Sequence, residues 1–250
     1  MHPIVVIPAR MAASRLPGKP LLDIGGMPMI LRVLRQAEAA GIGPVAVAAG
    51  DPEIAWTVEA AGGRVVLTDP DLPSGSDRIR AALAELDPHG EHDVVLNLQG
   101  DIPFVDPEVI ADCVGLLDAE PDCDIATIAA PESSPADRSN PDTVKAVLAI
   151  KPGADAAQAL YFTRSTLYGD QPIWWHFGIY AYRRAALDRF CAAPPSPLER
   201  REKLEQLRAL EMGMSIWALL VERAPVEVNT PADLEFARAH AARIDGGRLI

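Results

Sequence analysis

The sequence predicts an α/β fold with a mostly parallel central sheet and an inserted antiparallel arm. In the first half of the chain, short aliphatic runs alternate with segments of helical period, which is typical of βαβ units. In the second half, the runs have mixed polar and apolar faces, as the strands of an antiparallel extension do. A chain of 250 residues is long enough for one domain of this class.

The elements of the first half follow in order. Residues 4–7 form an unbroken aliphatic run that ends at a proline, which predicts a strand covered on both faces. The apolar residues from Ile30 to Ala37 recur at i, i+3, i+4 and i+7, which is the period of an α-helix. We expect strands at residues 4–7, 45–48, 64–67, 93–98 and 124–129, and helices at residues 30–37, 52–61, 76–86 and 107–117.

The second half changes character. Residues 191–197 hold three prolines and predict a loop. We expect strands at residues 143–148, 175–182 and 215–221, and helices at residues 198–213 and 231–242. The whole sequence therefore predicts a single domain over residues 1–250, in which residues 131–190 form the antiparallel arm.

The net charge of the chain is −12, from 23 Lys and Arg against 35 Asp and Glu. An acidic surface repels phosphate backbones, so we expect no general binding to nucleic acid. Cys113, Cys123 and Cys191 form no Cys-x-x-Cys pair and are expected to be reduced packing residues. The sequence shows no signal peptide and no apolar stretch near the ~18 residues of a membrane helix, so we expect a cytoplasmic protein without a membrane partner.

A basic loop follows the first strand, at the edge where parallel α/β sheets bind ligands. It carries Arg10, Arg15 and Lys19, with Gly18 next to the lysine. Cations and free backbone N–H groups of this kind can hold a polyphosphate. The spacing is not that of a P-loop, because Lys19 precedes a proline rather than Ser or Thr. A solvated turn is the alternative that the residues leave open.

Two further segments are expected at the same edge of the sheet. Asp101 follows a predicted strand, where its carboxylate can hold Mg²⁺ together with phosphate oxygens. The alternative is a helix cap, for which Asp106 is better placed. Ser74 and Gly75 precede a helix and can offer donors to a nucleobase, although a plain N-cap explains them equally well.

Together these motifs resemble those of the 3-deoxy-manno-octulosonate cytidylyltransferases, also called CMP-Kdo synthetases, where Kdo is 3-deoxy-D-manno-octulosonate. The resemblance covers nearly the whole chain, which makes it more specific than any single motif. It is carried by PAR (8–10), RLPGKPL (15–21), SGSDR (74–78), NLQGD (97–101), YFTR (161–164), HFGIYAYR (176–183), PPSPLE (194–199), EKLEQLR (202–208) and NTPADLE (229–235).

The resemblance implies a three-layer, Rossmann-like nucleotide-diphospho-sugar transferase fold. It implies that CTP and Kdo are the partners and react to give CMP-Kdo and pyrophosphate, for lipopolysaccharide biosynthesis. The anomeric hydroxyl of the sugar attacks the α-phosphorus, so positioning and cations dominate over covalent chemistry. The resemblance also implies Mg²⁺ as cofactor and a homodimer formed through the arm at residues 131–190.

The matched positions carry the roles of the family onto this sequence. Arg10, Lys19 and Asp101 are the implied catalytic residues, and Asp101 and Asn229 are the implied metal ligands. The implied nucleotide-binding residues are Ala9, Arg10, Arg15, Lys19, Ser74, Gly75, Arg78 and Gln99. On the residues alone, Arg78 is better explained as a charge on a helix surface.

The implied substrate-binding residues are Gln99, Arg164, His176, Tyr180, Glu205 and Gln206. Arg164 is the implied partner of the Kdo carboxylate, a role that suits a bidentate guanidinium. His176 and Tyr180 lie at i and i+4 of a strand and share one face, although a lone histidine among aromatic residues is more often packed in a core. Glu205 and Gln206 lie beside an apolar helical stripe, where a solvated helix face is the alternative.

One departure from the family concerns the metal. Asn229 stands where the family usually carries Asp, and an amide offers Mg²⁺ an oxygen without negative charge. We therefore expect weaker metal binding there, or metal held mainly by Asp101 and the CTP phosphates. Two other functions stay open: a cytidylyltransferase for a related acidic sugar, such as amino-Kdo or a sialic-like sugar, and a nucleotide-binding protein of low turnover.

Overall fold

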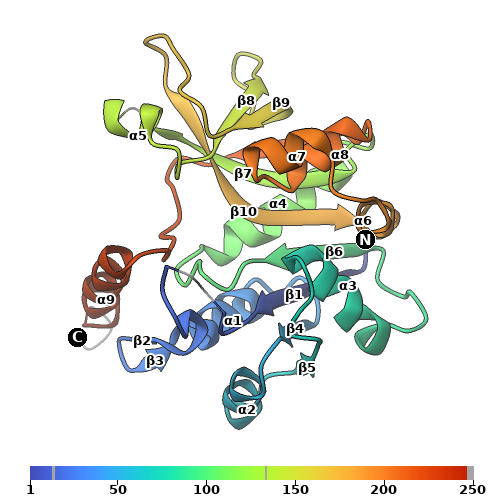
Figure 1. Ribbon diagram of the computed structural model, residues 1–250, viewed down its shortest axis with the longest axis vertical. Coiled ribbons are helices and arrows are strands. Elements are labelled where there is room, and N and C mark those ends of the chain that lie inside the picture. The colour runs from blue at the N-terminus through green and yellow to red at the C-terminus, as the bar shows by residue number, and fades with distance from the viewer. Residues whose placement is uncertain (13–14, 133, 247–250) are drawn as a thin grey trace. The chain divides into compact units, whose positions relative to one another are not determined.

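A computed structural model describes residues 1–12, 15–132 and 134–246 of the protein (Figure 1). The chain forms two compact units. Of the described residues, unit 1 contains 1–2, 92–96, 111–132 and 134–224, and unit 2 contains 3–12, 15–91, 97–110 and 225–246. Among the described helices, none has the length and apolar character needed to cross a bilayer.

Unit 2 contains parallel strands in the order β5-β4-β1. Val5 of β1 lies opposite Val45 of β4, and Val47 of β4 lies opposite Val65 of β5. The aliphatic side chains of β1 are buried because α1 and α3 pack on this strand. The elements are β1 (Pro3–Ala9), the 3₁₀ helix η1 (Lys19–Leu21), β2 (Asp23–Ile24), β3 (Met27–Pro28), α1 (Met29–Ala39), β4 (Val45–Ala49), α2 (Pro52–Ala60), β5 (Val65–Leu67), α3 (Gly75–Leu86) and α9 (Pro231–Gly246).

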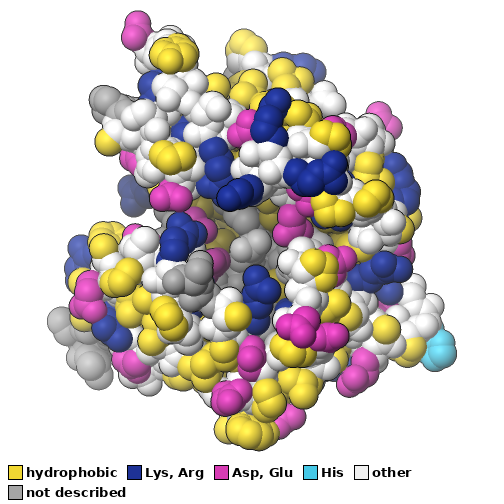
Figure 2. All heavy atoms as spheres, in the orientation of Figure 1, with side chains coloured by type: hydrophobic (Ala, Val, Ile, Leu, Met, Phe, Trp, Pro, Cys, Tyr) yellow, Lys and Arg dark blue, Asp and Glu magenta, His cyan; other side chains and the backbone are white. Residues whose placement is uncertain are grey.

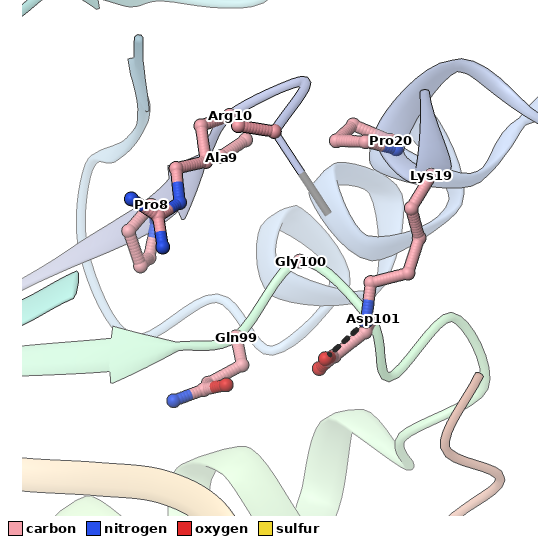
Figure 3. Close-up of a pocket in the computed structure, with 9 residues that line it drawn as sticks. Pro8, Ala9, Arg10, Lys19, Pro20, Gln99, Gly100 and Asp101 are labelled. Atoms are coloured by element: carbon pink, nitrogen blue, oxygen red, sulfur yellow. Dashed lines mark hydrogen bonds and ion pairs between the residues drawn. The ribbon is translucent and has the colours of Figure 1, made fainter. Parts of the chain in front are cut away.

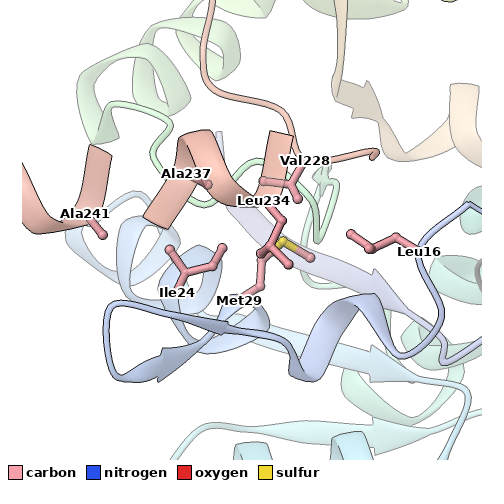
Figure 4. Close-up of a cluster of buried hydrophobic side chains, with 7 residues drawn as sticks. All are labelled: Leu16, Ile24, Met29, Val228, Leu234, Ala237 and Ala241. Carbon is pink, nitrogen blue, oxygen red and sulfur yellow. The ribbon is translucent and has the colours of Figure 1, made fainter. Parts of the chain in front are cut away.

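A cluster of buried apolar side chains joins the C-terminal helix α9 to the first elements of unit 2 (Figure 4). It consists of Leu16, Ile24, Met29, Val228, Leu234, Ala237 and Ala241. Leu16 belongs to the basic loop, and Val228 immediately precedes Asn229. The cluster therefore holds the basic loop and the segment before α9 on one scaffold.

Unit 1 is built around β7, which pairs in parallel with β11 and antiparallel with β10. Antiparallel pairing continues from β11 to β9 and from β9 to β8. The elements are β7 (Ile125–Glu132), α5 (Pro135–Ser139), β8 (Lys145–Ala149), β9 (Ala156–Thr163), β10 (Ile173–Arg183), α6 (Arg184–Ala192), α7 (Pro197–Glu202), α8 (Gln206–Glu211) and β11 (Ile216–Leu220). Two elements, β6 (Val94–Leu98) and α4 (Pro107–Ala119), have residues in both units.

The predicted α/β class, its parallel strands and its antiparallel extension are confirmed. All strands and helices expected in the first half are present, with ends that differ by a few residues. The strand β9 was not predicted, because it contains three alanines, a residue that is depleted in strands. The expectation of one domain over residues 1–250 stays a prediction.

Two expectations for the second half are wrong in detail. The helix expected at residues 198–213 is interrupted, because Lys203 has a φ of 56° in the left-handed region and ends α7. The loop expected at residues 191–197 is shorter, because α6 continues to Ala192 and α7 begins at Pro197. Proline suits the first position of a helix, where no backbone donor is needed.

A buried ion pair ties α8 to α7. Arg208 donates to both carboxylate oxygens of Glu199, from Nε to Oε2 at 2.7 Å and from Nη2 to Oε1 at 2.6 Å. The guanidinium carbon also lies 4.4 Å from the centre of the Phe190 ring. Burial raises the pKa of Glu199, but the hydrogen bonds and the charge of Arg208 outweigh burial and leave the pKa below its usual value.

We predict that Arg208→Met lowers the free energy of unfolding by about 3–5 kcal/mol, because it leaves the Glu199 carboxylate buried without its cation. Urea denaturation measures the change. The matched control is Glu199→Leu combined with Arg208→Met, which removes both charges and is expected to cost less than the single change. A double variant that costs as much as the single one would contradict this account of the pair.

Candidate active site

The basic loop leaves β1 after Ala9 and returns through a glycine turn. Gly18 has a φ of 69°, a conformation that favours glycine, and its N–H donates to the carbonyl of Met11 at 3.3 Å. This turn starts the 3₁₀ helix at Lys19. Residues 13 and 14 lie outside the described part of the chain, whereas Arg10 and Arg15 are described and exposed.

A cavity of about 280 Å³ lies where β1 and β6 end (Figure 3). It is lined by Pro8, Ala9, Arg10, Ala12, Lys19, Pro20, Gln99, Gly100 and Asp101. Gly100 lies next to Pro8, since a side-chain carbon at Gly100 would be in van der Waals contact with the Pro8 carbonyl oxygen, 3.4 Å away. The cavity lies at the end of the parallel strands where ligands of α/β sheets bind.

The ammonium group of Lys19 donates three hydrogen bonds beside the cavity. Its Nζ donates to Asp101 Oδ2 at 2.7 Å, to the Val228 carbonyl at 3.0 Å and to Asn229 Oδ1 at 3.1 Å. In Figure 3 the lysine side chain extends toward the Asp101 carboxylate. One ammonium thus joins the loop after β1, the loop after β6 and the segment before α9.

The oxygens around Lys19 fit a hard divalent cation. Asp101 Oδ1 is buried and has no hydrogen-bond partner among the described residues, so it is an acceptor that a cation would satisfy. Asn229 Oδ1 is a second oxygen of the kind that Mg²⁺ accepts. No group of three or more His, Cys, Asp or Glu able to hold a metal occurs among the described residues. The remaining ligands would have to be water and phosphate oxygens.

Glu227 adds a carboxylate that the sequence analysis did not consider. Burial raises the pKa of Glu227 to about 7, and the charge of Asp101 adds to this shift, while a hydrogen bond with Asn229 and the charges of Lys19 and Arg15 oppose it. The side chain is half-buried. The only signal in the sequence is its position two residues before Asn229.

The segment at residues 74–78 is held by local contacts. Ser74 Oγ accepts from the backbone N–H of Asp77 at 3.1 Å, so the plain N-cap is the role that the structure shows. Arg78 is only 2% exposed, and it donates to Thr68 Oγ1 at 2.6 Å and to the Asp69 carbonyl at 2.9 Å. The explanation of Arg78 as a surface charge is therefore wrong.

Gly50, which directly follows β4, leaves space for the Arg78 side chain. A side-chain carbon at Gly50 would lie 2.8 Å from Arg78 Nη1 and 3.2 Å from the Cβ of Arg10, so a larger residue would displace one of the arginines. Burial lowers the pKa of Arg78, and the neighbouring charge of Arg10 lowers it further. The glycine thus lets two cations come close to the end of the sheet.

The second set of candidate residues lies in unit 1. The ring of His176 lies 4.7 Å from that of Phe162 and 5.4 Å from that of Tyr180, measured between centres. A register irregularity in β10 separates the two paired segments that contain His176 and Tyr180. Burial lowers the pKa of His176 to about 3, so this imidazole is neutral throughout the physiological range.

Thr127 is the hydrogen-bond partner of His176 Nε2. The Thr127 hydroxyl donates to the Ile179 carbonyl at 2.7 Å, and Thr127 Oγ1 lies 3.0 Å from His176 Nε2. The Phe177 carbonyl lies 3.3 Å from the same hydroxyl oxygen. A hydroxyl has one proton, and when a carbonyl accepts it, His176 Nε2 is the donor of the bond to Thr127. The Nδ1 atom of His176 then carries a lone pair and can only accept.

Arg164 is anchored at the end of α7. Its Nε donates to the Glu202 carbonyl at 3.1 Å, its Nη1 donates to the Pro141 carbonyl at 2.8 Å, and its backbone N–H donates to Glu202 Oε2 at 3.1 Å. Glu205 and Gln206 follow the turn at Lys203 and begin α8, where Gln206 is buried. The left-handed turn at Lys203 therefore sets the position of Glu205 and Gln206 at the start of α8.

Comparison with known proteins identifies the family. A family model described as cytidylyltransferase matches residues 4–216. A 3-deoxy-manno-octulosonate cytidylyltransferase of Parvibaculum lavamentivorans is 58% identical over 243 residues, which cover 97% of this chain and 93% of that protein. A protein of the same name from Bradyrhizobium sp. is 60% identical over 236 residues, which cover 94% of this chain and 95% of that protein. The chain belongs to the cytidylyltransferase family.

Two solved structures extend the comparison. A CMP:2-keto-3-deoxy-manno-octonic acid synthetase in complex with CTP matches with a TM-score of 0.88 and 38% identity, covering 98% of this chain and 100% of that one. A 4-diphosphocytidyl-2C-methyl-D-erythritol synthase of Anaerococcus prevotii matches with a TM-score of 0.63 at 14% identity, which shows the fold alone. The Rossmann-like nucleotide-sugar transferase fold is thus confirmed.

Only part of the residue set implied by the family resemblance gathers at the cavity. Ala9, Arg10, Lys19, Gln99 and Asp101 line it, and Asn229 is joined to it through Lys19. Four implied nucleotide-binding residues are not among its lining residues: Arg15, Ser74, Gly75 and Arg78. Gly75 nevertheless lies close to the strand end, since a side-chain carbon there would be 3.4 Å from Pro8 Cγ.

We predict that Thr127→Val removes the acceptor for the His176 Nε2 proton and lowers the free energy of unfolding by about 1–3 kcal/mol. In ¹⁵N NMR spectra the parent is expected to show the Nε2–H tautomer without titration between pH 5 and 8. Thr127→Ser, which keeps the hydroxyl, is the matched control and should preserve that spectrum. A parent spectrum dominated by the Nδ1–H tautomer would refute the assignment.

Proposed function

We propose that the protein is a 3-deoxy-manno-octulosonate cytidylyltransferase, which converts CTP and Kdo to CMP-Kdo and pyrophosphate. The observation that carries the proposal is the cavity at the ends of β1 and β6, which Arg10 lines and in which Lys19 donates to the Asp101 carboxylate. Cations next to a carboxylate with an open oxygen suit a magnesium-bound polyphosphate. The names of the relatives supply the identity of the sugar acid.

Unit 2 is the proposed site for CTP. Arg10, Arg15 and Lys19 are placed on one loop and can bind the triphosphate, whose charge a local group of cations attracts although the chain is acidic overall. Gln99 offers an amide on the opposite segment of the cavity. Ser74, Gly75 and Arg78 are proposed to form the wall toward the nucleoside. Arg78 would do this mainly by holding the loop before α3.

Asp101 and Asn229 are the residues that would hold Mg²⁺. The ion, when bound, neutralises negative charge that develops on the phosphate oxygens. Lys19 occupies the space between the two oxygens, and its three-donor ammonium can turn from them to the phosphates. We therefore propose that Lys19 and the cation share these acceptors, with the lysine moving toward the nucleotide.

Unit 1 supplies the proposed residues for Kdo. Arg164 would pair with the sugar carboxylate through guanidinium donors beyond those that hold it to Pro141 and Glu202. His176 would accept a hydrogen bond from a sugar hydroxyl at Nδ1, because the imidazole is neutral and its Nε2 faces Thr127. Tyr180, Glu205 and Gln206 would complete the contacts to sugar hydroxyls.

In the reaction, the anomeric oxygen of Kdo forms a bond to the α-phosphorus, and the bond from that phosphorus to the pyrophosphate oxygen breaks. The contribution of the protein is to align the two oxygens and stabilise charge. Arg10 and Lys19 are the proposed catalytic cations, and Asp101 is the proposed holder of the metal. CTP is a cytoplasmic nucleotide, and we propose the same location for the enzyme.

A homodimer through residues 131–190 is also proposed. This region contains exposed apolar side chains, including Leu160 on β9 at 58% exposure and Ile150 after β8 at 41% exposure. Apolar groups of this kind favour an interface with a second copy.

Analytical ultracentrifugation of the parent and of Leu160→Lys tests the proposal, since the charged residue should shift the equilibrium to monomer.

A pyrophosphate-release assay with CTP, UTP, ATP and GTP, with and without Kdo, tests the function. We expect release only with CTP and Kdo together. Release with amino-Kdo or a sialic acid instead of Kdo would favour the related acidic sugar. Binding of CTP without release of pyrophosphate would favour a nucleotide-binding protein of low turnover. That alternative is tested because Asn229 brings no negative charge to the metal site.

Asp101→Asn is expected to lower kcat at least about a hundredfold, because the metal loses its charged ligand. The assay is pyrophosphate release at saturating Mg²⁺. Asp118→Asn, at an exposed position of α4, is the control for a loss of carboxylate elsewhere. Full turnover by the Asp101 variant, with an unchanged fold by circular dichroism, would remove the metal assignment.

Arg164→Ala is expected to lower kcat/KM for Kdo by about a hundredfold, near 3 kcal/mol, since a charged hydrogen-bond pair is lost. The KM for CTP should change little. Arg164→Lys keeps the charge without the two-pronged geometry and should fall between the parent and Arg164→Ala. Equal losses for both substrates would argue against a role specific to the sugar acid.

A further inference from the structure

We infer that Lys145 is a positioning residue for the sugar acid, because its buried ammonium anchors Arg164 and so sets the direction of the guanidinium. This role rests on the proposed function, in which Arg164 is the partner of the Kdo carboxylate. Lys145 lies outside the motifs that carry the family resemblance. Lys145, Arg164 and their hydrogen-bond partners all belong to unit 1.

The sheet of unit 1 places Lys145 beside Arg164. Lys145 on β8 lies opposite Thr163 on β9 and opposite Trp175 on β10, so neighbouring strands flank it on both sides. The residue is fully buried, at 0% exposure. A cation out of contact with solvent must find acceptors within the protein, because burial without them is costly.

The acceptors of Lys145 are two backbone carbonyls. Its Nζ donates to the Asn140 carbonyl at 2.5 Å and to the Arg164 carbonyl at 3.1 Å. Asn140 is followed by Pro141, whose carbonyl accepts from Arg164 Nη1 at 2.8 Å. One ammonium therefore holds both the backbone of the arginine and the segment that receives its guanidinium.

Glu202 completes the anchor of Arg164. Its Oε2 accepts from the Arg164 N–H at 3.1 Å and from Thr163 Oγ1 at 3.2 Å, and its carbonyl accepts from Arg164 Nε at 3.1 Å. The N–H of Arg164 thus meets a carboxylate, and the carbonyl of Arg164 meets an ammonium. The bonds of Nε and Nη1 fix the plane of the guanidinium, so the direction of its Nη2 donors is set before a ligand binds.

The position of Lys145 is unfavourable for a charge that serves stability alone. Burial lowers the pKa of Lys145, and the charge of Arg164 lowers it further, while the charge of Asp137 opposes the shift. An apolar side chain of similar length would avoid the cost of burying one cation near another. The ammonium offsets that cost through Arg164, because a binding group held in place beforehand loses less entropy when its ligand arrives.

The experiment is a double-variant cycle in the steady-state kinetics of the full-length protein. Lys145→Met keeps the length of the side chain without the ammonium and is expected to lower kcat/KM for Kdo at least about tenfold, through KM, because a displaced guanidinium binds the carboxylate poorly. The KM for CTP should change little. In the Arg164→Ala background the same change should cost no more than about twofold, because the group that it positions is absent. Lys151→Met, at an exposed position after β8, is the matched control and should behave as the parent does.

Equal losses in the two backgrounds, or parallel rises in both KM values, would show that Lys145 acts only on the fold and would overturn the inference. Lys145→Gln keeps a hydrogen-bond donor and is expected to fall between the parent and Lys145→Met. If circular dichroism shows that Lys145→Met is unfolded, Lys145→Gln takes its place in the cycle, with the same outcomes for and against.

A measurement without substrate separates the role of Lys145 from the proposed function. Solvent exchange of the Arg164 Nε proton, followed by ¹⁵N NMR and assigned with Arg164→Lys, is expected to be at least about tenfold faster in Lys145→Met than in the parent, since the bond to Glu202 opens more often. Unchanged exchange would overturn the inference even in an active enzyme. A parent that releases no pyrophosphate would instead overturn the proposed function, whereas faster exchange in the variant would still support the anchoring of Arg164.

Discussion

The contacts of Lys19 are the constraint on which the site of unit 2 depends. Its ammonium brings together an Asp101 oxygen, the Val228 carbonyl and the Asn229 amide oxygen, which come from distant parts of the sequence. A cation partly removed from water is stable only where acceptors replace its hydration. One of these acceptors belongs to Val228, whose side chain is part of the apolar cluster that includes α9. Packing near the end of the chain therefore determines where the loop after β1 lies.

The parts of the fold that could be predicted are those where local pattern and burial agree. The aliphatic run of β1 is buried as its pattern indicates, and the apolar stripe of α1 faces the core. The break between α7 and α8 could not be predicted, because Lys203 carries no marker of a left-handed conformation. Nearby, the buried pair of Arg208 and Glu199 joins the two short helices, and periodicity alone does not report such a contact.

At the site, the sequence predicted correctly which segments of the chain meet. It was less successful in predicting the contacts of individual side chains. Arg10, Lys19 and Asp101 gather because parallel strands end at one edge of a sheet. Arg78 was expected on the surface, but its guanidinium donates to Thr68 and to backbone carbonyls of the loop before α3, and it packs against Gly50. Glu227 lies in a segment without helix or strand, where no period indicates the direction of a side chain. Side-chain partners in such places become visible only in three dimensions.

The overall charge and the local charge of this protein act on different length scales. Acidic side chains are scattered over the face shown in Figure 2 rather than gathered in one patch. At physiological ionic strength their field decays over about 8 Å, so a bound triphosphate responds mainly to the nearest groups. Arg10 and Lys19 can then hold an anion in a chain of charge −12. The local cations at the ends of the strands, rather than the net charge of the chain, therefore decide whether an anion can bind there.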